Sequence, residues 1–159
     1  MNETLQDIQV ASFRLGHDIY AVDIMRIKEI IRPQKLVSLP RFPSFVEGII
    51  NLRGRIVPVI DIGKRFNLPR SYNERTTCLL IVTVGQRLVG LVVDEMTGVI
   101  SFPAKDLKPS PEVMDGIRAE YLVGVCLVDD ALVMLLNPDT LLSGQETVEL
   151  GMIDRETQV

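Results

Sequence analysis

The sequence has no tryptophan, one histidine and two cysteines in 159 residues, and only 5% of its residues are aromatic. A metal site needs several closely spaced ligands, so this composition argues against one. Cys78 and Cys126 each lie inside an apolar run, where we expect them to be small core residues. With so few aromatic residues, the core must consist of Val, Ile and Leu, a composition that favours strands.

Basic charge is also in short supply, with 17 Lys and Arg residues against 21 Asp and Glu residues. Phosphate binding requires a basic footprint, so neither nucleic acid nor an anionic membrane is expected as the main partner. The longest apolar stretches, such as 88–93, are far too short to cross a bilayer. The first residues contain no basic and apolar signal region, so we expect a cytoplasmic protein without direct membrane insertion.

Catalytic motifs are missing as well. No glycine-rich phosphate loop of the form GxxxxGK[ST] or GxGxxG is found. His17 lies in a Gly-His-Asp turn, and Asp23, Asp61 and Asp94 each end an apolar strand, where Asp is usually a turn or cap residue. We therefore expect neither an enzyme nor a bound cofactor.

What the sequence does contain is apolar, strand-forming runs: 47% of the residues are hydrophobic and the mean hydropathy is +0.23. Helix signals are short, with Asp61 as a cap for 62–66 and Asn137-Pro138 opening a helix at 139–142. The segment after Gly144 is polar and is predicted to be a frayed helix or disordered. The predicted strands are 8–15, 19–22, 27–31, 48–52, 56–60, 78–84, 88–93, 97–102, 122–127 and 131–136.

The strand pattern repeats. Residues 13–23 resemble 82–94, and 48–61 resemble 124–137, so the order is hairpin, hairpin and then the same again. We predict an all-β fold of two small β-barrels packed on each other, with the break near 69–77. The alternative is one β-sandwich with accidental similarity. The expected subdomains are 14–75 and 76–144, followed by a polar tail at 145–159.

The segment from Glu47 to Asp61 is the most distinctive. Two apolar runs flank Asn51-Leu52-Arg53-Gly54-Arg55, which predicts a hairpin whose reversal uses a positive φ at Gly54. Pro58 cannot donate a ladder hydrogen bond, so its strand is predicted at a sheet edge or at a bulge. An arginine-rich turn beside such an edge indicates a docking surface.

Several blocks resemble the CheW family of chemotaxis adaptors. They are 16–23, 24–30, the signature 51–61, 90–94 with Val99, and 120–124, and in order they cover about 9–142. The resemblance implies a single CheW-like domain, 1–159, of two five-stranded SH3-like barrels with short helices. It implies no catalysis. It implies an adaptor that joins chemoreceptor cytoplasmic tips, held between the barrels, to the regulatory domain of the histidine kinase CheA.

The resemblance also suggests site residues. Ile27, Glu29, Gly48, Asn51 and Arg53 are the expected receptor-binding set, with Arg53 pairing with Glu29; period two places Ile27 and Glu29 on one strand face. The alternatives are a solvated turn arginine, a core isoleucine and a strand bend at the glycine. Kinase-facing positions are expected on 89–93 and 99–102, namely Val89, Val92 and Val99.

Three other functions stay open at this point. A nucleic-acid-binding barrel would need stacking aromatic residues and a basic stripe, which are scarce here. A small β-barrel enzyme would need a nucleophile–base pair or a metal cluster. The same adaptor could also serve a motility or developmental signalling pathway instead of chemotaxis.

Overall fold

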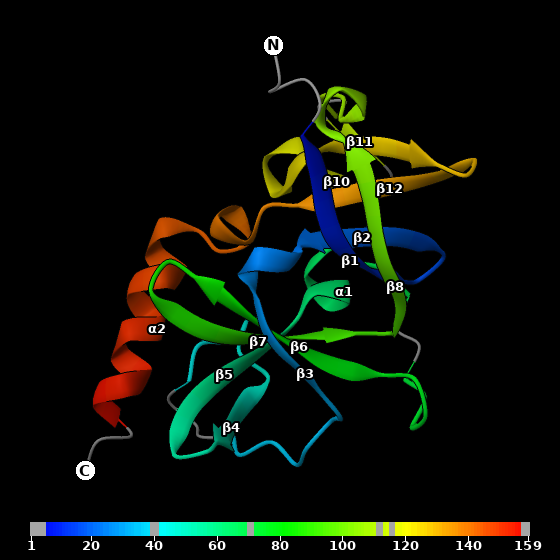
Figure 1. Ribbon diagram of the computed structural model, residues 1–159. Coiled ribbons are helices and arrows are strands. Elements are labelled where there is room, and N and C mark those ends of the chain that lie inside the picture. Colours follow the sequence, from blue (N-terminus) through cyan, green and yellow to red (C-terminus); the bar gives the residue numbers. More distant parts are fainter. Residues whose placement is uncertain (1–5, 39–41, 70–71, 111–112, 115–116, 157–159) are drawn as a thin grey trace.

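The computed structural model describes residues 6–38, 42–69, 72–110, 113–114 and 117–156 (Figure 1). Residues 1–5, on which the expected lack of a signal sequence partly depends, lie outside these ranges. Within the described residues, the strands are β1 (Asp7–Leu15), β2 (Asp18–Asp23), β3 (Ile27–Ile31), β4 (Gly48–Leu52), β5 (Arg55–Asp61), β6 (Cys78–Val84), β7 (Arg87–Val93), β8 (Glu95–Pro103), β9 (Val113–Met114), β10 (Ile117–Arg118), β11 (Leu122–Val128) and β12 (Ala131–Leu136).

Helices are few, as expected from the sequence. Among the described residues, no helix is long and apolar enough to cross a membrane. The helices are α1 (Ile62–Arg65), α2 (Gly144–Glu156) and the 3₁₀ turns η2 (Ile24–Arg26), η3 (Ala104–Asp106), η4 (Ala119–Tyr121) and η5 (Pro138–Thr140).

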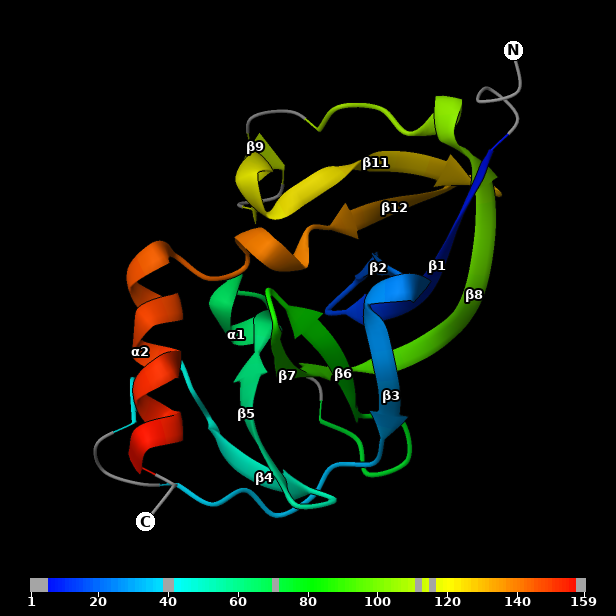
Figure 2. The same ribbon diagram turned by 60° about the vertical axis from the view of Figure 1, so that its left-hand side comes forward.

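Ten strands form two five-stranded units, which confirms the predicted all-β class. One sheet has the order β11-β12-β2-β1-β8 and is called barrel A here; the other has the order β3-β6-β7-β5-β4 and is called barrel B. Figures 1 and 2 show barrel A above barrel B, with α2 lying along the side of barrel B. A short pair, β9 and β10, forms a separate two-stranded sheet.

Each barrel takes strands from both halves of the chain, so the predicted subdomains 14–75 and 76–144 are wrong. The hairpin β1–β2 pairs with β8 and β12, whereas the hairpin β6–β7 pairs with β3 and β5. In each barrel, the second strand of this hairpin runs parallel to a neighbouring strand: β2 pairs with β12 in barrel A, and β7 pairs with β5 in barrel B. The duplication is therefore real, but the two repeats exchange their first hairpins.

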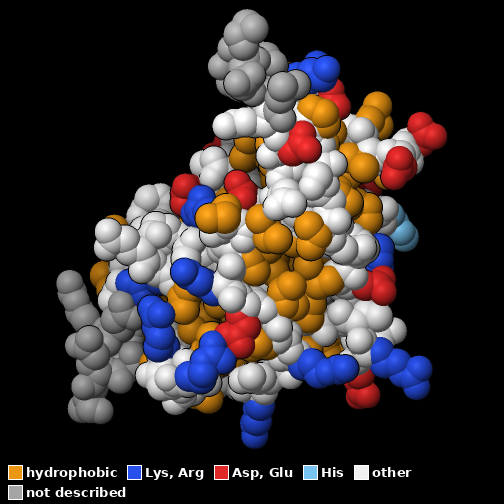
Figure 3. Space-filling view, viewed as in Figure 1, with side chains coloured by type: hydrophobic (Ala, Val, Ile, Leu, Met, Phe, Trp, Pro, Cys, Tyr) orange, Lys and Arg blue, Asp and Glu red, His pale blue; other side chains and the backbone are white. Residues whose placement is uncertain are grey.

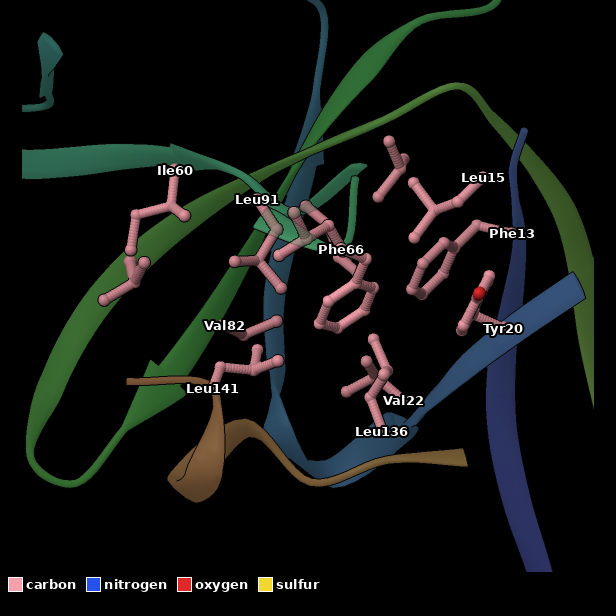
Figure 4. Packing of buried hydrophobic residues seen from close by; sticks show 14 of the residues in the cluster. Phe13, Leu15, Tyr20, Val22, Ile60, Phe66, Val82, Leu91, Leu136 and Leu141 are labelled. Atoms are coloured by element: carbon pink, nitrogen blue, oxygen red, sulfur yellow. The ribbon is translucent and has the colours of Figure 1, made fainter. Parts of the chain in front are cut away.

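The largest apolar cluster lies between the barrels, because outward-facing residues of both sheets pack against each other. Its aromatic part is a chain of rings, with the Tyr20 and Phe66 centroids 6.1 Å apart and those of Phe66 and Tyr121 5.2 Å apart. Figure 4 labels ten members of this shared core: Phe13, Leu15, Tyr20, Val22, Ile60, Phe66, Val82, Leu91, Leu136 and Leu141.

A smaller cluster belongs to each barrel. Cys126 lies in that of barrel A and Cys78 in the shared core, so both cysteines are core residues as predicted, and burial raises the pKa of both thiols. The barrel A cluster contains Val10, Ala21, Phe102, Cys126, Val133 and Leu135. The barrel B cluster contains Ile50, Leu52, Val57, Val59, Leu79 and Ile81.

The C-terminal segment is a helix over Gly144–Glu156, so of the two alternatives predicted for the polar segment after Gly144 the helix is confirmed and disorder is wrong over that range. Leu150 and Ile153, spaced three apart, are 1% and 2% exposed and join the shared core. Two apolar anchors among polar residues give a weak helix pattern, which explains why the sequence left disorder open as the alternative. The predicted cap at Asp61 is confirmed, since its Oδ1 accepts a hydrogen bond from the Lys64 amide at 3.0 Å.

Pro58 does not lie on an edge strand, because β5 runs between β4 and β7. Its partner on β4 is Ile49, three pairs from the hydrogen-bonded turn pair Leu52 and Arg55, so its nitrogen points away from β4. On the β7 side, pairing begins only at Val59. The missing N–H therefore falls just outside the parallel ladder, and the strand accommodates proline without an edge.

Candidate functional site

The turn between β4 and β5 is a two-residue reversal, since Leu52 pairs with Arg55. Both turn residues have positive φ, 50° at Arg53 and 87° at Gly54, as a type I′ turn requires. The Asn51 side-chain oxygen accepts a hydrogen bond from the Gly54 amide at 2.7 Å. Asn51 therefore holds the turn, and the turn presents Arg53 to solvent.

Arg53 forms a two-pronged ion pair with Glu29, as the resemblance predicted. Arg53 Nη1 donates to Glu29 Oε1 at 3.0 Å, and Nη2 donates to Oε2. The hydrogen bond from Arg53 is the main cause that lowers the pKa of Glu29. The Arg53 side chain remains 71% exposed, so the pair itself adds little stability.

The Glu29–Arg53 ion pair also has a structural role, because of the two strands that it joins. Glu29 lies on β3 and Arg53 follows β4, and these are the two outer strands of the barrel B sheet. The ion pair thus joins the first and last strands at one end of the barrel. A second link, a backbone bridge between Val37 and Ile49, closes the same seam further along.

A shallow hollow opens beside the ion pair at this end of barrel B, and we call it the barrel B rim. Leu52 and Leu88, both associated with the barrel B cluster, contribute its apolar part, and the rest is charged. The Lys28 and Arg55 side chains lie on this rim and are exposed. The complete lining is Lys28, Glu29, Leu52, Arg53, Arg55 and Leu88.

Two of the predicted receptor-binding residues lie away from the rim. Ile27 is half-buried and packs against the shared core. A register shift between Ile27 and Glu29 in the pairing with β6 interrupts the strand alternation, so the argument that both share one face does not hold. The structure therefore brings together Glu29, Asn51 and Arg53 but not Ile27.

Gly48 is buried, and the neighbour that approaches it belongs to its own chain. A Cβ at this position would lie 2.7 Å from the Leu36 Cβ and 3.0 Å from the Val37 carbonyl oxygen. Gly124 occupies the equivalent place in barrel A, where a Cβ would lie 2.5 Å from the Lys108 carbonyl oxygen. The repeat therefore uses glycine twice to let a crossing segment bridge an outer strand.

Of the predicted kinase-facing residues, Val89 is misplaced. It is 1% exposed and belongs to the shared core, so it cannot contact another protein directly. Both faces of β7 are apolar because each faces a different core, and the sequence therefore could not show which residues point outward. Val92 is half-buried against the barrel B cluster, whereas Val99 on β8 is 60% exposed.

Other charged groups join the barrels to the C-terminal elements. Arg26 donates to both carboxylate oxygens of Asp139, at 2.6 and 3.2 Å, and this pairing is the main cause that lowers the Asp139 pKa. Burial opposes ionisation of Glu146, yet hydrogen bonds from Arg65 and Ser143 outweigh it and lower the Glu146 pKa. Across the described ranges, no group of three or more His, Cys, Asp or Glu side chains could hold a metal ion.

Sequence reasoning missed four of the six residues that line the rim. The four residues that were not predicted as binding residues are Lys28, Leu52, Arg55 and Leu88. Leu88 comes from the other repeat, so only the hairpin exchange brings it beside Leu52. The one local signal was the unbalanced pair of arginines in the turn.

Comparison with known proteins gives one family. The family described as a CheW-like domain matches residues 9–146. The chain is similar to chemotaxis protein CheW of Treponema pallidum, 34% identical over 150 residues that cover 92% of this chain and 88% of that protein. It is also 34% identical over 134 residues to CheW of Klebsiella aerogenes, covering 84% and 81% of the two chains.

Solved structures give the same result. The scaffolding protein TtCheW of Thermoanaerobacter tengcongensis matches with a TM-score of 0.82 and 29% identity, covering 89% of this chain and 91% of that chain. The paired SH3-like arrangement expected from the sequence blocks is therefore confirmed.

Proposed function

Because this chain belongs to the CheW family, whose members are non-enzymatic scaffolds of chemotaxis signalling, we propose that it joins chemoreceptor cytoplasmic tips to the regulatory domain of the histidine kinase CheA. In this role the protein is recruited from the cytoplasm to receptor arrays at the membrane. Its work is to hold two partners at fixed positions, and the rigid double barrel suits that task.

The receptor contact is proposed at the barrel B rim, centred on Glu29, Asn51 and Arg53. The observation that carries this assignment is the exposed, two-pronged Glu29–Arg53 pair. Long charged side chains lose conformational freedom when they are fixed in one geometry, so this pair presents a preorganised surface to a partner. Gly48 lies at the other end of β4 from the turn, where it allows the 36–37 segment to bridge β4 and close the barrel B seam.

The receptor surface is proposed to continue toward barrel A. Figure 3 shows hydrophobic side chains gathered at the centre of the face on which β1, β3 and β8 lie in front. Two exposed apolar residues come from elements on this side: Met25 on η2 is 83% exposed and Ile30 on β3 is 48% exposed. A helical tip offers an apolar stripe flanked by charge, which matches an apolar face beside the charged rim.

The kinase contact is proposed on barrel A around β8, where Val99 is exposed. Separate surfaces would let one adaptor hold both partners together, and several weak contacts would then strengthen one another. Val92, half-buried on β7 of barrel B, stays a predicted kinase-facing residue and lies outside this surface on barrel A.

The experiment is a pull-down with purified receptor fragment and purified kinase regulatory domain, using wild type and Arg53→Glu. The substitution replaces the ion pair by two adjacent carboxylates, so we expect loss of the receptor fragment and retention of the kinase domain. Circular dichroism of the variant checks that the fold persists. Normal capture of both partners by a folded variant would refute the rim assignment.

A further inference from the structure

Charge is strongly segregated along the chain, and the basic residues are concentrated in the part that forms barrel B. Residues 24–93, which hold all five strands of barrel B, contain 12 of the 17 Lys and Arg residues but only 4 of the 21 Asp and Glu residues. That segment therefore has a formal charge of +8, and the rest of the chain has −12. In Figure 3, blue side chains gather over the lower part of the molecule, where barrel B lies, and red ones are more frequent above.

The segregation is sharpest at two equivalent turns. In barrel B the β4–β5 turn is Arg53-Gly54, followed by Arg55. In barrel A the β11–β12 turn, also a two-residue reversal with positive φ, is Asp129-Asp130. The duplicated fold thus presents the same backbone feature twice with opposite charge. Fold stability does not require this difference, because both turns are solvent-exposed.

The barrel B rim has more positive charge than its own carboxylate neutralises. Glu29 is paired with Arg53, whereas Lys28 and Arg55 make no ion pair with any described residue. Between these cations, Leu52 and Leu88 supply an apolar floor. The rim therefore combines unneutralised cations with a site for one apolar side chain.

From this arrangement we infer that the barrel B rim binds an acidic helical segment, in which an apolar side chain sits over Leu52 and Leu88 and Asp or Glu side chains meet Lys28 and Arg55. The inference rests on the proposed receptor contact and gives its charge chemistry. A nucleic acid fits less well, because its phosphates would not use the apolar floor and the −12 remainder of the protein would repel an extended polyanion. Binding should weaken with salt, as screening of exposed charges requires.

The test measures binding of the soluble cytoplasmic fragment of a chemoreceptor from the same genome, by calorimetry in about 0.05 M and about 0.5 M NaCl. The variant is Lys28→Gln with Arg55→Gln. The matched control is Lys105→Gln with Lys108→Gln, which removes two exposed cations from the barrel A side and changes the net charge equally. Circular dichroism confirms that both variants are folded.

We expect the rim variant to bind about two- to thirty-fold more weakly at low salt, and to lose much of its salt dependence, while the control binds like wild type. Equal weakening in both variants would overturn the rim assignment in favour of overall charge. Unchanged or tighter binding by the rim variant would overturn the inference that the bound segment is acidic.

Two further arms separate the possible failures. If Arg53→Glu abolishes binding of the receptor fragment but the rim variant binds it as well as wild type does, the proposed function stands. The inference that the bound segment is acidic is then wrong. If Arg53→Glu also binds normally, the proposed receptor site itself is wrong. Salt-sensitive binding of a labelled single-stranded oligonucleotide that the rim variant loses would replace the helical protein partner by a nucleic acid.

Discussion

Replacing Gly48 by alanine tests whether this glycine serves the fold, by letting the 36–37 segment cross β4, or contacts a partner. The new Cβ would lie 2.7 Å from the Leu36 Cβ and 3.0 Å from the Val37 carbonyl oxygen, both well inside ordinary contact distance. Those two atoms cannot retreat freely, because Val37 and Ile49 exchange hydrogen bonds of 3.0 and 2.8 Å. Overpacking of a closed site typically costs about 1–3 kcal/mol, and we expect about 2 kcal/mol for Gly48→Ala.

The assay is urea unfolding followed by far-UV circular dichroism, since the chain has no tryptophan for fluorescence. Two glycines provide the comparison. Gly124→Ala should cost at least as much, because its Cβ would meet the Lys108 backbone oxygen at 2.5 Å. Gly90→Ala should change stability by less than about 1 kcal/mol, because its nearest neighbours are side-chain methyl groups at 3.4 Å. A Gly48→Ala variant that is as stable as wild type but fails to bind the receptor would refute this reasoning. It would show instead that Gly48 contacts the receptor directly.

Other predictions follow from the C-terminal elements. Ile153→Ala should lower the free energy of unfolding by about 2–5 kcal/mol, because this side chain is buried in the shared core; unfolding no different from wild type would mean that α2 is not part of the folded unit. A double-mutant cycle on Arg26 and Asp139 should give a coupling of about 0.5–1 kcal/mol, since the pair is partly exposed, and a coupling near zero would contradict the ion pair. The lowered pKa values of Asp139 and Glu146 mean that the unfolded chain binds protons first as the pH falls; stability should therefore be full above the ordinary carboxyl pKa and decline below about pH 4, and Glu146→Gln should flatten that decline.

Local features of the fold were predictable because local chemistry determines them. Gly54 has the positive φ that its turn position required, and Asp61 caps the helix that follows it. The ten main strands were recognised from apolar runs between turn residues. Each of these features depends on neighbours within a few residues, so one sequence contains the necessary information.

Pairing between distant strands was not predictable in the same way. Internal similarity showed that the chain is duplicated, but it could not show that the repeats exchange hairpins, as in the parallel pairing of Tyr20 with Met134. Val89 was misplaced for a related reason. Its strand is apolar on both faces because one faces the shared core and the other faces the barrel B cluster. When both faces of a strand are apolar, the order of apolar and polar residues does not show which side chains point toward which core.

The candidate site was predicted in part. The pairing of Arg53 with Glu29 came from the family resemblance, since spacing alone could not place β3 and β4 at the two ends of one curled sheet. The bulge after Ile27 was not visible in the sequence, and it turns that residue toward the shared core and away from the rim. The apolar floor of the rim was missed because Leu88 comes from the exchanged hairpin.

Chemical-shift mapping on the isotope-labelled protein tests the central claim most directly. Receptor fragment and kinase regulatory domain are titrated separately and then together. The receptor fragment should perturb amides around Glu29, Asn51 and Arg53, the kinase domain should perturb a separate set that includes Val99 on β8, and both sets should shift in the mixture. Overlapping sets, with one partner displacing the other, would contradict an adaptor that holds both at once.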